Sequence, residues 1–204
     1  MHWKAVFLDK DGTLIENVPY NVDPALIRLT DEALEGLRLL QAGCYKLILV
    51  SNQSGIARGL FKEEDLLPVE ERLHQLLSEG CVSLDGFYYC PHHAGGVVRQ
   101  YAQDCTCRKP NPGMLFRAAD DHHVNLTASW LLGDILDDIE AGNRAGCRTI
   151  LVDNGNETEW RLTTHRRPDF IVKNLFVAAY LIRAIEDSNR LEPLSSGDYE
   201  HKFA

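Results

Sequence analysis

The chain has no apolar run close to the roughly 20 residues that cross a membrane, so we expect no membrane span. It also has no run of Lys and Arg, and its net charge of -9 argues against nucleic acid or an anionic membrane surface as a partner. Residues 1–4 lead straight into an apolar segment, which predicts no signal peptide and a cytoplasmic protein. Internal repeats, low-complexity segments and linkers are absent as well. We therefore expect one domain over residues 1–186 with a polar tail over 187–204, and a monomeric protein.

Short apolar segments alternate with amphipathic ones along the chain. The apolar segments predict strands at residues 5–8, 46–50, 87–89, 130–134, 149–152 and 170–172. Helical spacing of apolar residues predicts a helix capped by Thr30, and further helices at 63–79, 112–122, 137–145 and 174–186. Pro68 should separate or kink the first turn of the second helix. This alternation is typical of a doubly wound α/β fold, in which a mostly parallel, Rossmann-like sheet carries helices on both faces.

Acidic residues stand at the ends of two predicted strands. Asp9 and Asp11 follow the first strand, two residues apart, so their side chains point the same way while Lys10 faces elsewhere. Two like charges this close need a cation or a shared proton. Parallel strands place their carboxyl ends together, which brings in Asp134 from the fourth strand. Oxygen atoms of Asp9, Asp11 and Asp134 predict a Mg²⁺ site, with Asp138 one helical turn farther on to orient the metal or its waters.

The same residues suit phosphoryl transfer. Asp9 can attack phosphorus to form an aspartyl-phosphate, and Asp11 can protonate the leaving oxygen and later activate water. Ser51 and Asn52, after the second strand, offer a hydroxyl and an amide to the phosphoryl oxygens, and Lys109 can neutralise charge in the transition state. Each residue alone also has a structural explanation as a turn residue, a solvated charge or an acid at a helix start. The joint pattern favours chemistry.

Four motifs resemble those of the haloacid-dehalogenase superfamily: DKDGT at 9–13, the Ser51-Asn52 pair, Lys109 and GDxxxD at 133–138. Most members are Mg²⁺-dependent phosphatases with an aspartate nucleophile. The stretches SNQSGIARG at 51–59 and CRKPNPGM at 107–114 narrow the resemblance to the group of heptose-bisphosphate and histidinol-phosphate phosphatases. The resemblance implies Asp9 as the nucleophile, Asp11 as the acid and base, and Arg108 at the distal part of the substrate. Ile135 departs from the pattern, because heptose enzymes often carry lysine there.

Three of the six cysteines lie in residues 90–107, a segment without a regular period. Cys90, Cys105 and Cys107, with His92, supply three thiolates and one imidazole, a set typical of a closed structural Zn²⁺ site. His93 is an alternative ligand, and a disulfide is an alternative use of the cysteines. We expect the Zn²⁺ to do no chemistry but to hold the cations that follow the last ligand, Arg108 and Lys109. The other cysteines are expected to be buried free thiols: Cys44, Cys81 and Cys147.

The segments between these motifs are too short for a large cap domain, so we expect an open pocket. Residues 17–20, residues 55–58 and the zinc loop should form its walls. The expected substrate contacts come from Asn17, Tyr20, Asn52, Gln53, Ser54, Arg58 and Arg108. Such a pocket suits a small phosphorylated sugar, and the resemblance implies removal of the 7-phosphate of D-glycero-D-manno-heptose 1,7-bisphosphate. The alternatives are histidinol phosphate or another small sugar phosphate, a phosphomutase, or a non-catalytic zinc-stabilised binding module.

Overall fold

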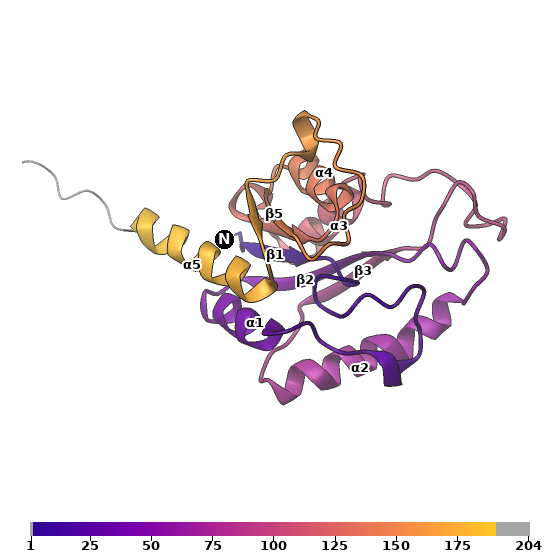
Figure 1. Cartoon of the computed structure of the whole chain (residues 1–204), viewed down its shortest axis with the longest axis horizontal. Coiled ribbons are helices and arrows are strands. Elements are labelled where there is room, and N and C mark those ends of the chain that lie inside the picture. Colours follow the sequence, from indigo (N-terminus) through magenta and orange to yellow (C-terminus); the bar gives the residue numbers. More distant parts are fainter. Residues whose placement is uncertain (1, 191–204) are drawn as a thin grey trace, which may run out of the picture.

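The computed structural model describes residues 2–190, in which six parallel strands form one sheet (Figure 1). The strands stand in the order β3-β2-β1-β4-β5-β6 across the sheet. Their bounds are Ala5–Leu8 for β1, Lys46–Asn52 for β2, Gly86–Cys90 for β3, Trp130–Gly133 for β4, Arg148–Val152 for β5 and Phe170–Val172 for β6. All six predicted strands are present. β1 lies between β2 and β4, and its residues are buried on both faces of the sheet.

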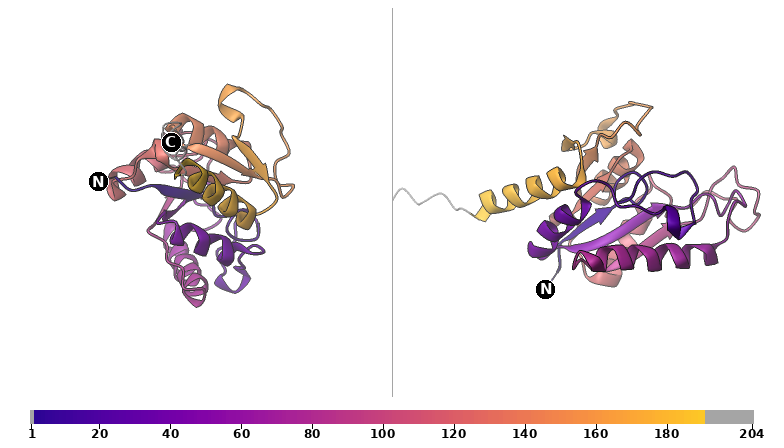
Figure 2. Two further views of the ribbon diagram at one scale, coloured as in Figure 1. Left: turned by 90° about the vertical axis from the view of Figure 1, so that its left-hand side faces the viewer. Right: turned by 60° about the horizontal axis from the view of Figure 1, so that its bottom comes forward.

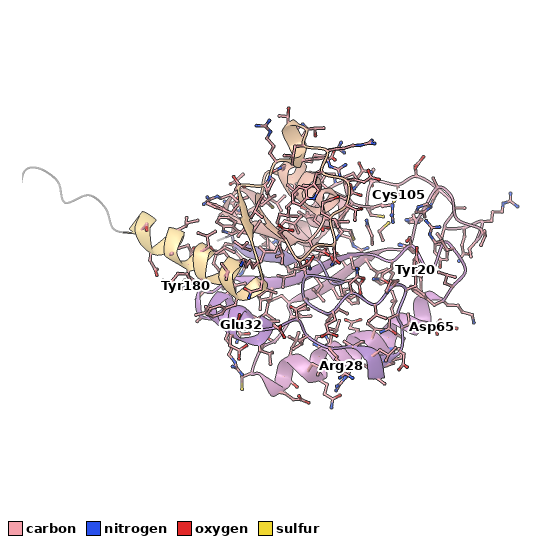
Figure 3. The ribbon with its side chains drawn as sticks, viewed as in Figure 1. Tyr20, Arg28, Glu32, Asp65, Cys105 and Tyr180 are labelled. Carbon is pink, nitrogen blue, oxygen red and sulfur yellow. The ribbon has the colours of Figure 1, made fainter. Side chains whose placement is uncertain are left out.

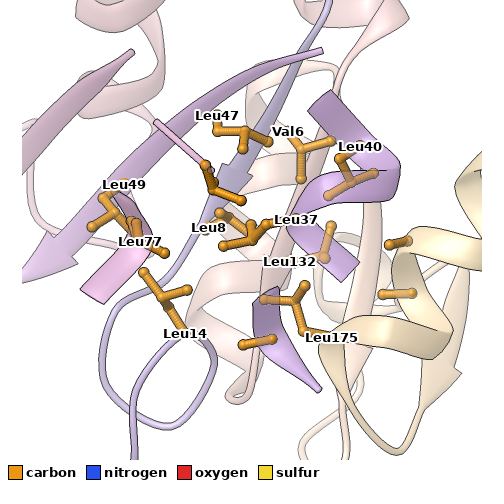
Figure 4. Close-up of a cluster of buried hydrophobic side chains, with 14 of the residues drawn as sticks. Val6, Leu8, Leu14, Leu37, Leu40, Leu47, Leu49, Leu77, Leu132 and Leu175 are labelled. Atoms are coloured by element: carbon orange, nitrogen blue, oxygen red, sulfur yellow. The ribbon is translucent and has the colours of Figure 1, made fainter. Parts of the chain in front are cut away.

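Within residues 2–190, five α-helices cover the two faces of the sheet (Figure 2). They are α1 (Ala33–Ala42), α2 (Leu66–Glu79), α3 (Gly113–His122), α4 (Leu136–Ala145) and α5 (Leu175–Arg190). Side chains alternate between the faces along β1. Val6 and Leu8 pack with α1, α2 and α5 (Figure 4), whereas Phe7 packs with α3 and α4. This arrangement confirms the expected doubly wound α/β fold.

Several helix boundaries differ from those predicted. α1 begins at Ala33, and Thr30 does not cap it, because its hydroxyl donates to the carbonyls of Thr13 and Leu14 instead. A short 3-10 helix, η2 (Glu63–Asp65), precedes α2, which confirms the separate first turn expected from Pro68. α5 continues to Arg190 rather than ending near 186, so residues 187–190 of the expected tail are helical. The remainder of that tail, residues 191–204, lies outside the described residues.

The connections at the carboxyl edge of the sheet are short or irregular. Between β1 and α1 the chain forms only a 3-10 helix, η1 (Pro24–Leu26), and residues 91–112 contain no helix or strand. Residues 2–190 thus contain no large cap domain, as expected. No helix in this range is both long enough and apolar enough to span a bilayer.

The burial of the three cysteines outside the zinc loop differs in part from the prediction. Cys147 is buried, but Cys44 and Cys81 are exposed, so the expectation for these two was wrong. Each of the two follows a glycine that ends a helix, and each has a left-handed φ of 58° or 56°. The turn directs the side chain to solvent although the neighbouring sequence is apolar.

Candidate active site

The carboxyl ends of β1, β2 and β4 bring the predicted residues together. Leu8 is level with Leu49 of β2 and with Leu132 of β4, so the residues that follow these three positions emerge at one edge of the sheet. The Asp9 amide continues the pairing by donating to the Leu132 carbonyl at 2.9 Å. Figure 3 shows Tyr20 and Cys105 at this end of the molecule, far from Tyr180 on α5.

Three carboxylates surround one lysine at this edge. Asp9, Asp134 and Asp138 each offer an oxygen, and these atoms lie within 4.8 Å of one another. Lys109 is buried, and its Nζ forms an ion pair with Asp9, lies 2.6 Å from Asp138 Oδ1 and donates to the Val50 carbonyl at 2.8 Å. Asp138 therefore lies directly beside Asp9 and Lys109. A residue that only orients the metal or its waters would be expected to lie farther from the proposed nucleophile.

This cluster fits a divalent cation. Three buried carboxylates against one ammonium leave an excess of negative charge, and all the donors are oxygen atoms, which Mg²⁺ prefers. Burial raises the pKa of Asp134 to about 6 and also raises the pKa of Asp138. Both shifts show that negative charge is costly in this buried cluster, and a bound cation would offset that cost.

The Asp11 carboxylate lies apart from the other three. Its Oδ1 accepts from Lys10 Nζ at 2.6 Å, and its Oδ2 accepts from Gln53 Nε2 at 3.3 Å. The buried Lys10 side chain thus turns back to Asp11, contrary to the expectation that it faces elsewhere. Burial raises the pKa of Asp11, which is the direction that suits a general acid.

The polar residues after β2 form a second group. Gln53 Nε2 donates to Ser51 Oγ at 2.7 Å, so Gln53 links Ser51 with Asp11. Asn52 clamps the backbone of Lys109: its Oδ1 accepts from the Lys109 amide and its Nδ2 donates to the Lys109 carbonyl, both at 3.0 Å. The amide that was expected to contact phosphoryl oxygens is therefore used to hold the catalytic lysine candidate.

The predicted zinc ligands also come together. Cys90, His92, Cys105 and Cys107 place their ligand atoms within 4.8 Å, with the Cys107 sulfur 3.1 Å from that of Cys90 and 3.4 Å from His92 Nδ1. The hydrogen bond between the Cys107 and Cys90 sulfurs lowers the pKa of the Cys107 thiol to about 5, which suits a thiolate ligand. His93 faces away, since its Nδ1 accepts from the Gly95 amide. The cluster can hold a metal ion, and His92 is the imidazole that it offers.

A cavity of about 260 Å³ opens beside Asp11. Its walls include six predicted site residues: Asp11, Asn17, Tyr20, Asn52, Gln53 and Ser54. Arg58 and Arg108 do not line it. Arg58 Nη2 lies 3.1 Å from His93 Nε2, and Arg108 Nη1 donates to the His92 carbonyl at 3.4 Å, so both arginines belong to the neighbouring zinc-loop wall.

Sequence reasoning missed the segment that follows β5. Asn154 Nδ2 donates to the Gly12 carbonyl at 2.5 Å, and Asn156 Nδ2 donates to Asp134 Oδ2 at 2.7 Å. Glu157 Oε2 accepts from the Leu136 amide at 2.6 Å, at the start of α4. The available signal was the run of polar residues directly after a strand, which is the same signal that identified Asp9 and Asp134.

Comparison with known proteins agrees with this site. Residues 106–178 match a family model described as "HAD-hyrolase-like". A D-glycero-beta-D-manno-heptose-1,7-bisphosphate 7-phosphatase of Pasteurella multocida is 44% identical over 153 residues, which cover 74% of this chain and 83% of the relative. The protein of the same name from Escherichia coli K12 is 38% identical over 169 residues, covering 78% of this chain and 88% of the relative.

A solved structure extends the similarity to three dimensions. The D,D-heptose 1,7-bisphosphate phosphatase of B. bronchiseptica, complexed with magnesium and phosphate, superposes with a TM-score of 0.74 at 26% identity. The match covers 89% of this chain and 99% of that one. The chain therefore belongs to the haloacid-dehalogenase superfamily, in the group that contains the heptose-bisphosphate and histidinol-phosphate phosphatases. The enzyme class expected from the motifs, a phosphoric monoester hydrolase, is confirmed.

Proposed function

We propose that this phosphatase removes the 7-phosphate of D-glycero-D-manno-heptose 1,7-bisphosphate through an aspartyl-phosphate on Asp9. The observation that carries the proposal is the setting of Asp9, whose carboxylate is paired with Lys109 and grouped with Asp134 and Asp138. The cavity beside Asp11 is small enough to select a compact substrate such as a phosphorylated sugar. The names of the relatives support the choice of sugar.

In the first step an Asp9 oxygen attacks phosphorus, and the bond from phosphorus to the sugar oxygen breaks. Asp11 gives its proton to that oxygen, so the sugar leaves as an alcohol. Gln53 supports this role because its amide binds both Asp11 and Ser51 and so fixes their relative position.

In the second step water attacks phosphorus and gives a proton to Asp11, and the bond from phosphorus to Asp9 breaks. Inorganic phosphate leaves, and Asp9 and Asp11 return to their starting states. Lys109 and Ser51 stabilise the negative charge on the phosphoryl oxygens in both steps. The buried position of Lys109 strengthens its effect, because little water screens its charge.

We propose that the carboxylates of Asp9 and Asp134 hold Mg²⁺, with Asp138 beside them, whereas the Asp11 carboxylate, which lies apart on Lys10 and Gln53, is left free for proton transfer. The excess of buried carboxylates over ammonium groups fits this ion, as described above. When bound, Mg²⁺ supplies positive charge that lets an anionic phosphate approach an ionised Asp9.

We also propose that Zn²⁺ fills the cluster of Cys90, His92, Cys105 and Cys107 and has a structural role. The four protein ligands leave no open position for water. Cys107 directly precedes Arg108 and Lys109, so a metal bound there restrains the backbone that carries both cations. Three thiol ligands also favour a reducing compartment, which agrees with our proposal of a cytoplasmic monomer.

The wall beside the cavity favours a second phosphate over a cationic amine. Arg58 and Arg108 contact the loop at His93 and His92, respectively, and they add positive charge to the zinc-loop wall. Histidinol phosphate carries an amine, which these arginines would repel. Ile135 follows Asp134 and adds no cation, so Arg58 and Arg108 have to supply recognition of the distal phosphate.

The test is phosphate release with Mg²⁺ from both anomers of the heptose bisphosphate, histidinol phosphate and fructose 1,6-bisphosphate. We expect the highest kcat/KM with a heptose bisphosphate, and no turnover by the folded Asp9→Asn variant. Histidinol phosphate turned over well above the heptose compounds would overturn the substrate assignment. Turnover by Asp9→Asn at the wild-type rate would overturn the mechanism.

A further inference from the structure

The connection between β5 and β6 reaches back to the reaction centre, and its part in the activity is not explained by the four sequence motifs. We propose that Asn156 is a positioning residue that fixes the Asp134 carboxylate for the divalent cation. The proposal rests on the metal site proposed above. It adds Asn156, which lies outside the carboxylate cluster, to the residues that determine the affinity for the cation.

The contact between the two side chains is short and directed. Asn156 Nδ2 donates to Asp134 Oδ2 at 2.7 Å, whereas Asp134 Oδ1 has only a long contact of 3.5 Å with the Thr13 hydroxyl. One carboxylate oxygen is therefore held by the amide and the other stays available to a cation. Because the Asp134 side chain is almost fully buried, no water competes strongly for this position.

The backbone of Gly12 closes the remaining space around the pair. A Cβ placed on Gly12 would lie 2.1 Å from Asp134 Oδ2 and 2.5 Å from Asn156 Nδ2. The carboxylate and the amide thus pack directly against the turn that carries Asp9 and Asp11. A shift of the Asn156 side chain would displace the Asp134 carboxylate, because neither side chain has free space next to Gly12.

Asn156 is itself held from both sides. Its backbone amide donates to Asn154 Oδ1 at 3.1 Å, and Asn154 Nδ2 donates in turn to the Gly12 carbonyl. On the other side, Glu157 binds the Leu136 amide at the start of α4. Asn156 therefore belongs to a segment that is hydrogen-bonded both to the turn after β1 and to the start of α4. These attachments fix the position from which its amide donates to Asp134.

The chemistry of an amide suits this position. Asn156 donates a hydrogen bond without adding charge, so it orients Asp134 without competing with the cation. A lysine there would neutralise the carboxylate, and a second carboxylate would repel it before the metal binds. Partners of metal ligands in this geometry commonly change metal affinity by about 10- to 100-fold when they are removed.

The test compares Asn156→Ala and Asn156→Leu with Thr158→Ala. Leucine has the same branching of heavy atoms as asparagine but no donor, and the exposed Thr158 lies in the same segment without a side-chain contact to the site. Calorimetric titration of the metal-free proteins with Mg²⁺ gives the affinity directly, and thermal unfolding without metal reports on folding. We expect both Asn156 variants to bind Mg²⁺ about 10- to 100-fold more weakly, with metal-free Tm values close to that of Thr158→Ala.

Mg²⁺ affinity equal to that of the wild type in both Asn156 variants would overturn the inference. A large drop in metal-free Tm with unchanged affinity would also overturn it, because Asn156 would then only support the fold. Asp134→Asn separates this result from failure of the metal site itself. Wild-type protein that binds no Mg²⁺, or an Asp134→Asn variant that binds it normally, would show that the proposed site is wrong.

Discussion

Replacing Asn52 by alanine should lower kcat far more than it changes KM. The substitution removes the two hydrogen bonds, each of 3.0 Å, that hold the amide and the carbonyl of Lys109. Lys109 Nζ then loses its fixed position beside Asp9, although the lysine itself is still present. A residue that bound the substrate directly would give the opposite result, a raised KM with kcat largely retained.

The magnitude follows from the contacts. Two neutral hydrogen bonds contribute about 1–3 kcal/mol together, so the variant should remain folded in a protein of ordinary stability. Losing a donor to transition-state charge altogether costs about 100- to 1000-fold in kcat. A displaced lysine keeps part of that stabilisation, and a shift of about 1 Å can cost on the order of 100-fold. We therefore expect kcat to fall by about 10- to 100-fold.

Steady-state phosphate release with the preferred heptose bisphosphate measures both constants. Asn52→Leu keeps the branching of the side chain without its polar atoms and should behave like the alanine variant. Asn125→Ala is a matched control, because Asn125 makes comparable local hydrogen bonds to Thr127 but lies away from the site. A tenfold rise in KM with kcat unchanged would refute the positioning role and restore the direct contact expected from the sequence.

Three further predictions concern the turn, the zinc loop and the carboxylate cluster. Gly12→Ala should abolish Mg²⁺ binding and activity, because Gly12 has φ +90° and a Cβ would meet Asp134 Oδ2 at 2.1 Å. Calorimetric titration with Mg²⁺ and steady-state kinetics measure the two effects. Normal Mg²⁺ binding by this variant would contradict the prediction. Cys107→Ala should reduce phosphatase activity while Mg²⁺ still binds, and full activity in the zinc-free variant would count against a structural role for zinc. In metal-free protein the free energy of unfolding should fall as the pH rises from about 4 to about 6, because burial raises the pKa of Asp134 from 3.8 to about 6 and the folded state then binds more protons than the unfolded state. Denaturant unfolding at several pH values measures this fall, which should be smaller in Asp134→Asn; an unchanged slope there would assign the effect to other groups.

Local sequence determined much of the fold and identified the candidate reacting groups. The position of Asp9 could be predicted because it directly follows an apolar strand. Such a strand must be buried, and its carboxyl end must lie beside those of its parallel neighbours. The same rule located Asp134 and Ser51, and the close spacing of Cys105 and Cys107 identified the metal cluster. These features depend on periodicity and on ligand chemistry, both of which are carried by neighbouring residues.

Tertiary structure alone decided how the polar side chains are used. Nothing in the sequence around Asn52 shows that its amide binds the Lys109 backbone, 57 residues away, instead of a phosphoryl group. The same holds for Asn156 on Asp134 and for Asp138 beside Lys109. An amide or a carboxylate accepts many partners at similar free energy, so its choice depends on which groups the packed chain brings within about 3 Å of it.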